Sequence, residues 1–186
     1  MWEYKDHGKS YDAVFHRKHP EGFRWLIESF GTNWRMTEMQ AAIGCNSYDK
    51  LPSWIKIRNE NAAIYGEMLK RFDCVRLTEI PVNIVHAFYK YYCFIRPEYL
   101  KAGWSRERIV HEISGEGIPC FTGSCWNISA EKCFVNRGWN KSKTDLPNAY
   151  ALKDTSLMFL VHPTLEKEDI YRACEVISKV LKEAGR

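Results

Sequence analysis

Apolar residues recur at helical intervals in four stretches of the chain, and they alternate with polar residues in others. Helices are therefore expected over four ranges: 37–51, 54–72, 105–115 and 166–182. The first range opens with a capping-box pattern, Thr37 followed by Gln40, and we expect that helix to end at Pro52 because proline interrupts helices. The third opens at Ser105 and is followed by glycines, which commonly stop helices.

Strands are expected where aromatic and β-branched residues gather between turn residues, over the ranges 73–77, 86–95, 118–121 and 156–161. The stretch HAFYKYYCFI, from His86 to Ile95, carries the strongest strand signal. Residues 1–30 and 123–150 are expected to be irregular, apart from a helical turn near 148–154. The order of the elements predicts an α+β fold, with a short antiparallel or mixed sheet and helices packed on one side of it.

The composition narrows the class of protein. The 186 residues include 45% hydrophobic and 27% charged residues, and the formal net charge is +4. The basic residues are spread among 23 acidic ones, so we expect no nucleic-acid partner. No apolar run approaches the roughly 20 residues of a membrane span, and no secretory leader is evident, so we expect a cytoplasmic protein without a membrane partner.

The cysteines allow two interpretations. Seven are present, without a C-x-x-C pair, and most lie in apolar surroundings, which is typical of buried thiols in a cytosolic protein. A zinc site built from Cys120, Cys125, Cys133 and His111 is the alternative, but their spacing fits no standard zinc pattern. We therefore expect no metal.

Residues that could bind a ligand lie just ahead of the first expected helix, in the stretch FGTNWRMTEMQAAIG from Phe30 to Gly44. Gly31 permits close approach of the backbone, the amide of Asn33 both donates and accepts hydrogen bonds, and Arg35 offers a planar fork suited to phosphate or carboxylate. Because a helix N-terminus also favours anions, the stretch suits a phosphorylated ligand. The alternative is a capped helix with a turn asparagine and a solvated arginine.

Several stretches resemble the DegT/StrS-like sugar aminotransferases. GTNWRMTEMQAAIG followed by KLPSWIKIRNENAAIYGEML resembles the G-x-N-x-R-M-[ST]-E-x-Q-A-A stretch of that family and its following helix. DHGK resembles the R-x-H-G segment, HAFYKYYCFI the aromatic strand, and EISGEGIPCF the unit of a helix and a G-I strand. LMFLVHPTLEKEDIYRACEVI is similar to the closing pattern L-x-L-P-x-x-P-x-L-x-x-x-D, so the resemblance covers nearly the whole chain.

The resemblance implies a fold and an activity. It implies the aspartate-aminotransferase fold (fold type I), with 37–186 as its small C-terminal domain and 1–36 as an irregular segment leading from a large domain absent from this chain. It implies a pyridoxal phosphate enzyme that moves an amino group, usually from glutamate, onto a nucleotide-linked keto sugar for cell-surface polysaccharide or related sugars. It also implies a homodimer with active sites at the subunit interface.

The resemblance also implies which residues take part. The lysine that forms the Schiff base precedes a G-E-G-G run, and this sequence has neither, so we expect no catalytic residue and no transamination by this chain alone. Asn33 matches an asparagine that reaches across the dimer to the cofactor phosphate. Arg35 matches an arginine near anionic sugars, with a structural ion pair as the alternative.

Other positions depart from the family pattern. Gly123 and Ser124, in FTGSCWNISAEKCF, fall where many relatives carry larger groups, and Ser124 is a candidate substrate contact. His86 is a second candidate substrate contact, with a hydrogen-bonded structural histidine as the alternative. The alternative function for the whole chain is a non-catalytic module that binds a partner or a nucleotide sugar.

Overall fold

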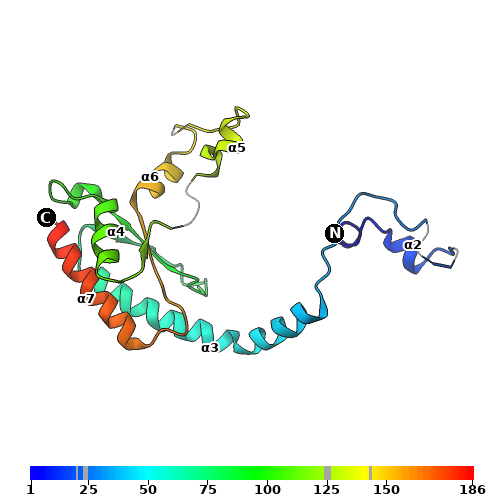
Figure 1. Ribbon diagram of the computed structural model, residues 1–186, viewed down its shortest axis with the longest axis horizontal. Coiled ribbons are helices and arrows are strands. Elements are labelled where there is room, and N and C mark those ends of the chain that lie inside the picture. The colour runs from blue at the N-terminus through cyan, green and yellow to red at the C-terminus, as the bar shows by residue number, and fades with distance from the viewer. Residues whose placement is uncertain (20, 23–24, 124–126, 143) are drawn as a thin grey trace. The chain divides into compact units, whose positions relative to one another are not determined.

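The computed structural model describes residues 1–19, 21–22, 25–123, 127–142 and 144–186. The chain divides into two compact units, Met1–Leu51 and Pro52–Arg186, and the long helix α3 (Glu38–Leu69) runs from the first into the second (Figure 1). The units differ in their cores: the second contains a large cluster of buried apolar side chains, whereas Ala13 and Leu26 are the buried apolar residues described in the first.

The second unit is built on a four-stranded sheet in the order β1-β2-β4-β3. Its strands are β1 (Val75–Leu77), β2 (Tyr91–Ile95), β3 (Cys120–Phe121) and β4 (Ser156–Phe159). Every neighbouring pair is antiparallel. The expected α+β class with a short antiparallel sheet is therefore confirmed.

Helices cover one face of this sheet. Along β2 the side chains of Tyr91, Cys93 and Ile95 are buried while the intervening residues are partly exposed, as the alternation of a strand requires. The buried set joins residues of α4 (Arg106–Gly115), α7 (Lys167–Ala184) and the second half of α3 in one apolar cluster. Figure 1 shows these three helices beside the sheet.

Local sequence signals set the helix boundaries. The Ser105 side chain accepts a hydrogen bond from the backbone of Arg108 and caps α4. Glu166 and Asp169 form a reciprocal capping box at the start of α7. Thr37 and Gln40 do the same ahead of α3, since the Thr37 amide donates to Gln40 Oε1 and the Gln40 amide to Thr37 Oγ1.

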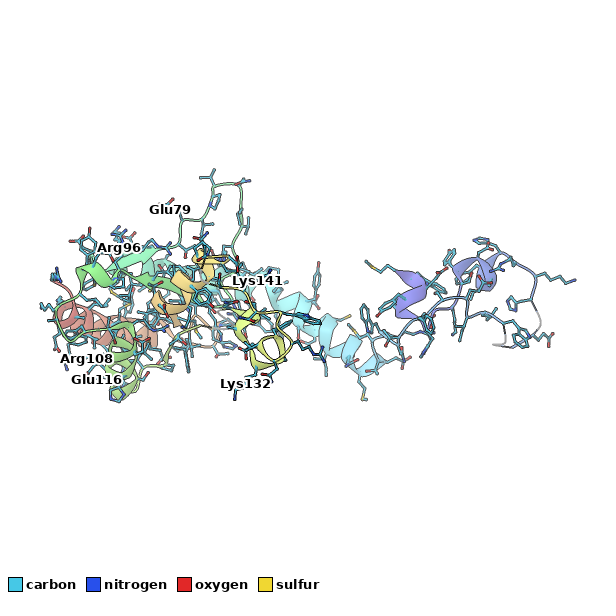
Figure 2. The ribbon with its side chains drawn as sticks, turned by 90° about the horizontal axis from the view of Figure 1, so that it is seen from above. Glu79, Arg96, Arg108, Glu116, Lys132 and Lys141 are labelled. Carbon is cyan, nitrogen blue, oxygen red and sulfur yellow. The ribbon has the colours of Figure 1, made fainter. Side chains whose placement is uncertain are left out.

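Short helices connect these elements. They are η1 (Pro97–Tyr99), η2 (Ile128–Ala130), α5 (Lys132–Val135) and α6 (Pro147–Thr155). The range 123–150 was expected to be mostly irregular, and it contains more helix than that pattern predicts. The connection between β1 and β2 is an extended loop, and Figure 2 shows Glu79 on it, projecting from the sheet.

The expected break at Pro52 is wrong. Helix α3 continues through this proline for 32 residues in all. Pro52 removes one backbone donor and its ring crowds the carbonyl four residues earlier, at an exposed position of the helix. The second half of the helix buries Ala62, Tyr65 and Leu69 in the core, and this packing supports the helical conformation beyond the proline.

The expected strand from His86 to Ile95 is too long, because β2 begins only at Tyr91. Phe88 has a φ of 41°, which is incompatible with a strand. The carbonyls ahead of β2 bond instead to side chains of α3: Arg58 donates to Phe88 and Tyr89, and Asn59 donates to His86.

The first unit contains more regular structure than the sequence pattern indicates. It has two short helices, α1 (Trp2–Lys5) and α2 (Tyr11–Phe15), besides the first part of α3. Two isolated antiparallel bridges, Asp6 with Asn33 and Lys9 with Ile27, tie its segments together. Among the residues described, no helix is long and apolar enough to cross a membrane.

Candidate functional site

The loop ahead of α3 is fastened to the first helix by backbone hydrogen bonds. The Thr32 amide donates to the Tyr4 carbonyl at 2.7 Å, and the Trp34 amide donates to the Lys5 carbonyl at 2.9 Å. In the opposite direction, the His7 amide donates to the Thr32 carbonyl at 3.1 Å. Residues 31–35 therefore have a fixed backbone next to residues 4–8, although the two segments are distant in sequence.

Two glycines make this close approach possible. A Cβ on Gly31 would lie 2.2 Å from the Gly8 nitrogen, and a Cβ on Gly8 would lie 1.7 Å from the Ser29 carbonyl oxygen. Gly8 also has a φ of 78°, which other residues adopt only with strain. Each glycine thus occupies a position where any side chain would push two backbone segments apart.

Arg35 forms an ion pair with a buried carboxylate. Its Nη2 donates to Oδ1 of Asp6, whose side chain is 9% exposed, and Lys9 Nζ lies 3.6 Å from the same oxygen. The hydrogen bond from Arg35 lowers the pKa of the Asp6 carboxyl, although burial acts in the opposite direction. Arg35 thus forms the structural ion pair that was the alternative to a ligand contact. Its side chain is still half-exposed.

The amide of Asn33 is exposed, as contact with a ligand requires. Its Oδ1 accepts a hydrogen bond from the Arg35 backbone amide at 3.2 Å, which closes a turn over three residues. This contact uses one lone pair of the side-chain oxygen and none of the N–H donors, so the NH₂ group is the part suited to an anionic ligand. A donor amide two residues from an arginine supplies N–H groups that suit the oxygens of a phosphate group.

His86 belongs to the second unit. Its Nδ1 accepts a hydrogen bond from the Phe88 amide at 3.0 Å, and its ring packs edge-on against that of Phe88 at 4.3 Å. Its backbone carbonyl is bound by Asn59. The exposed ring therefore has one nitrogen engaged in the loop, and Nε2 is the ring atom suited to a ligand.

The remaining candidates are Ser124 and the residues of the alternative zinc site. Ser124 and Cys125 lie outside the described residues. Within the described ranges, no three His, Cys, Asp or Glu side chains are grouped to hold a metal ion. Cys93 and Cys120 are buried in the apolar core, and burial raises the pKa of the Cys120 thiol to about 12.

The sequence did not indicate Asp6 as part of this loop. The only signal was its place in the DHGK segment, because a pair between residues 29 positions apart leaves no periodic pattern. The structure brings Asp6, Asn33 and Arg35 together in the first unit.

Comparison with solved structures identifies the class of protein. An aminotransferase from Psychrobacter cryohalolentis matches 97% of this chain with 41% identity and a TM-score of 0.85. A DegT DnrJ EryC1 StrS aminotransferase from Brucella abortus matches 96% of it with 21% identity and a TM-score of 0.75, and this likeness shows the fold. The sheet and its helices are therefore the fold of an aminotransferase part.

The family follows from the sequence comparison. The DegT/DnrJ/EryC1/StrS aminotransferase family matches residues 1–178, and the chain belongs to this family. An uncharacterized protein of Methanocaldococcus jannaschii is 26% identical over 179 residues. The chain spans 45% of the length of that protein and 48% of the Psychrobacter aminotransferase.

Proposed function

We propose that this chain is the C-terminal part of a pyridoxal phosphate-dependent sugar aminotransferase. In this proposal, residues 37–186 form the small domain and residues 1–36 form the segment leading into it. The parent enzyme transfers an amino group from glutamate to a nucleotide-linked keto sugar for cell-surface polysaccharide or a related sugar. It acts in the cytoplasm as a homodimer.

The observation that carries the proposal is the exposed donor amide of Asn33 in a family-specific loop. The family match covers the loop, and a protein of Streptococcus pneumoniae solved in its PLP form shares the fold, with a TM-score of 0.76 over 98% of this chain at 18% identity. When bound, the cofactor supplies an electron sink at the amino-bearing carbon. In our proposal Asn33 donates to its phosphate and holds it in place.

The substrate contacts in the proposal are Arg35, His86 and Ser124. Arg35 keeps donors beyond the one used on Asp6, because a guanidinium has five N–H groups. These suit an anionic group of the substrate. Nε2 of the exposed His86 residue suits a hydroxyl or a phosphate oxygen, and Ser124 is proposed from its sequence position alone.

The isolated chain is proposed to be inactive, because none of its lysines matches the family position that carries the cofactor. The test is to add pyridoxal phosphate, reduce with borohydride and locate modified lysines by mass spectrometry. We expect scattered substoichiometric modification. Stoichiometric modification of one lysine would contradict this part of the proposal.

A chimera tests the activity of the parent enzyme. The N-terminal part of the Psychrobacter aminotransferase would be joined to this chain, and the reaction with glutamate would be followed through the absorbance of the cofactor. We expect reaction in the chimera, and cofactor affinity lowered roughly tenfold or more by Asn33→Ala, because a hydrogen bond to a charged group is lost. Asn46→Ala, at another exposed asparagine of the same unit, is the matched control. Equal cofactor affinity in both variants would refute the role of Asn33.

A second candidate function is a non-catalytic interaction module. The exposed aromatic side chains of the first unit favour it: Phe30 is 98% exposed, Trp25 80% and Trp34 66%. This candidate predicts self-association or capture of a partner through these residues. Sedimentation of a monomer that does not change with added nucleotide sugar would argue against it.

A further inference from the structure

Asp6 is unusual among the acidic residues of the chain. In the described part, it is the one acidic residue that is buried, with 7% of its surface exposed. Burial of a carboxylate is costly unless the charge is paired and hydrogen-bonded. Arg35 and Lys9 supply that pairing, and the two cations with one anion leave a net positive charge of one.

Asp6 also lies opposite the loop in the register of the backbone. It pairs with Asn33 in an isolated antiparallel bridge, while its side chain binds Arg35 two residues further on. The backbone hydrogen bonds of this bridge come from the neighbours of Asp6: the His7 amide donates to the Thr32 carbonyl and the Trp34 amide donates to the Lys5 carbonyl. The Asp6 side chain adds the contact that holds the guanidinium of Arg35. The Asn33 turn adds a third link, since the Arg35 amide donates to Asn33 Oδ1.

We propose that Asp6 is the positioning residue of this loop, and that it holds Arg35 so that the remaining N–H groups of the guanidinium, besides their proposed contact with the substrate, also reach the phosphate that Asn33 contacts. The inference rests on the proposed function, in which Asn33 contacts a phosphate. Arginine has a long side chain that loses conformational freedom when it binds a ligand. A guanidinium already held by a carboxylate loses less, so the paired state binds phosphate more tightly.

The carboxylate also limits the charge of the loop. With Asp6 ionised, the loop offers a neutral amide and a cluster of modest positive charge. Without the Asp6 carboxylate, Arg35 and Lys9 repel each other and the Arg35 side chain can move toward solvent. The inference therefore predicts weaker phosphate binding on removal of a negative charge, which is the opposite of the simple electrostatic expectation.

The test is a titration of the ¹⁵N-labelled full chain with inorganic phosphate, followed by NMR at the Asn33 NH₂ group and the Arg35 Nε–H group. We expect both signals to shift in the unaltered protein. Asp6→Asn should weaken phosphate binding roughly tenfold or more and move the Arg35 signal toward that of a free side chain.

The matched control is Asp12→Asn. Asp12 also pairs with an arginine of the first unit, Arg17, at 2.7 Å, and its side chain is 62% exposed. Its replacement makes the same change of net charge and should leave phosphate affinity unchanged. A gain in affinity for Asp6→Asn would show that charge outweighs positioning and would overturn the inference.

The outcomes separate this inference from the proposed function. Equal phosphate affinity in Asp6→Asn and the unaltered protein overturns the positioning role and leaves the Asn33 contact intact. A titration without any shift at Asn33 in the unaltered protein overturns the phosphate contact, and the positioning role with it.

If the backbone signals of His7 and Thr32 show that Asp6→Asn disrupts the loop, the titration is repeated with Asp6→Glu in place of that variant. This variant keeps the charge and displaces it by one methylene, so the Arg35 signal should move and the affinity should fall. Unchanged affinity with a displaced Arg35 signal overturns the inference.

Discussion

Replacement of Gly31 by alanine tests the backbone contact on which the candidate site depends. The added Cβ would meet three backbone atoms: the Gly8 nitrogen at 2.2 Å, the His7 carbonyl carbon at 2.8 Å and the Tyr4 carbonyl oxygen at 2.8 Å. Backbone atoms cannot rotate away as a side chain does. Gly31 does not have a positive φ, so alanine adds no intrinsic conformational strain and the whole effect is steric.

The magnitude follows from the hydrogen bonds that must separate. Three backbone hydrogen bonds join residues 4–7 to residues 32–34, with lengths from 2.7 to 3.1 Å. Each contributes about 0.5–1.5 kcal/mol net, so their loss costs roughly 2–4 kcal/mol of local stability. This corresponds to a decrease of roughly 30- to 1,000-fold in amide-exchange protection.

The assay is hydrogen exchange measured by NMR at the Thr32 and Trp34 amides. Gly44→Ala is the control, because a Cβ at Gly44 would meet nothing within 4 Å. That glycine lies inside α3, so alanine there should stabilise the helix by about 1 kcal/mol and leave the loop amides unchanged. Unchanged protection of Thr32 and Trp34 in Gly31→Ala would refute the steric argument.

Three further predictions concern the core, the thiols and the ion pair. Phe159→Ala should lower the free energy of unfolding, measured in urea, by about 3–5 kcal/mol, because this ring is fully buried; a loss below about 1 kcal/mol would contradict that burial. A thiol reagent at neutral pH should modify the exposed cysteines first and the buried ones only on unfolding, in the order Cys45 and Cys133 before Cys74, Cys93, Cys120 and Cys174. Arg35→Ala should raise the pKa of Asp6 toward its ordinary value of 3.8, measured by carboxyl ¹³C NMR. Because the folded pKa is lowered, the ion pair stabilises the protein above pH 3.8 and that contribution is lost as the pH falls through the folded value.

Local sequence chemistry predicted the features that depend on neighbouring residues. The caps at Ser105 and at Thr37 with Gln40 were predicted because cap and partner lie three residues apart. The positions of four strands and the α+β class were predicted for a similar reason, since alternation and helical spacing are visible within one turn or strand. The exposed position of Asn33 also agrees with a loop ahead of a helix.

The features that the sequence missed depend on distant partners. Pro52 carries a local signal for a helix end, yet the packing of Tyr65 and Leu69 in the core outweighs the missing hydrogen bond and the crowding by the proline ring. The aromatic residues ahead of Tyr91 carry a strand signal, but side chains of α3 bind the carbonyls that a neighbouring strand would need.

The sequence by itself determined the periodic elements, their caps and the family-specific loop. Only the tertiary structure decided that Asp6 lies against Arg35 and that Gly8 and Gly31 touch, because a contact across 20 or more residues has no period along the chain. Such contacts depend on which distant segments of the chain pack together, and the buried carboxylate of Asp6 is costly there unless a cation pairs with it.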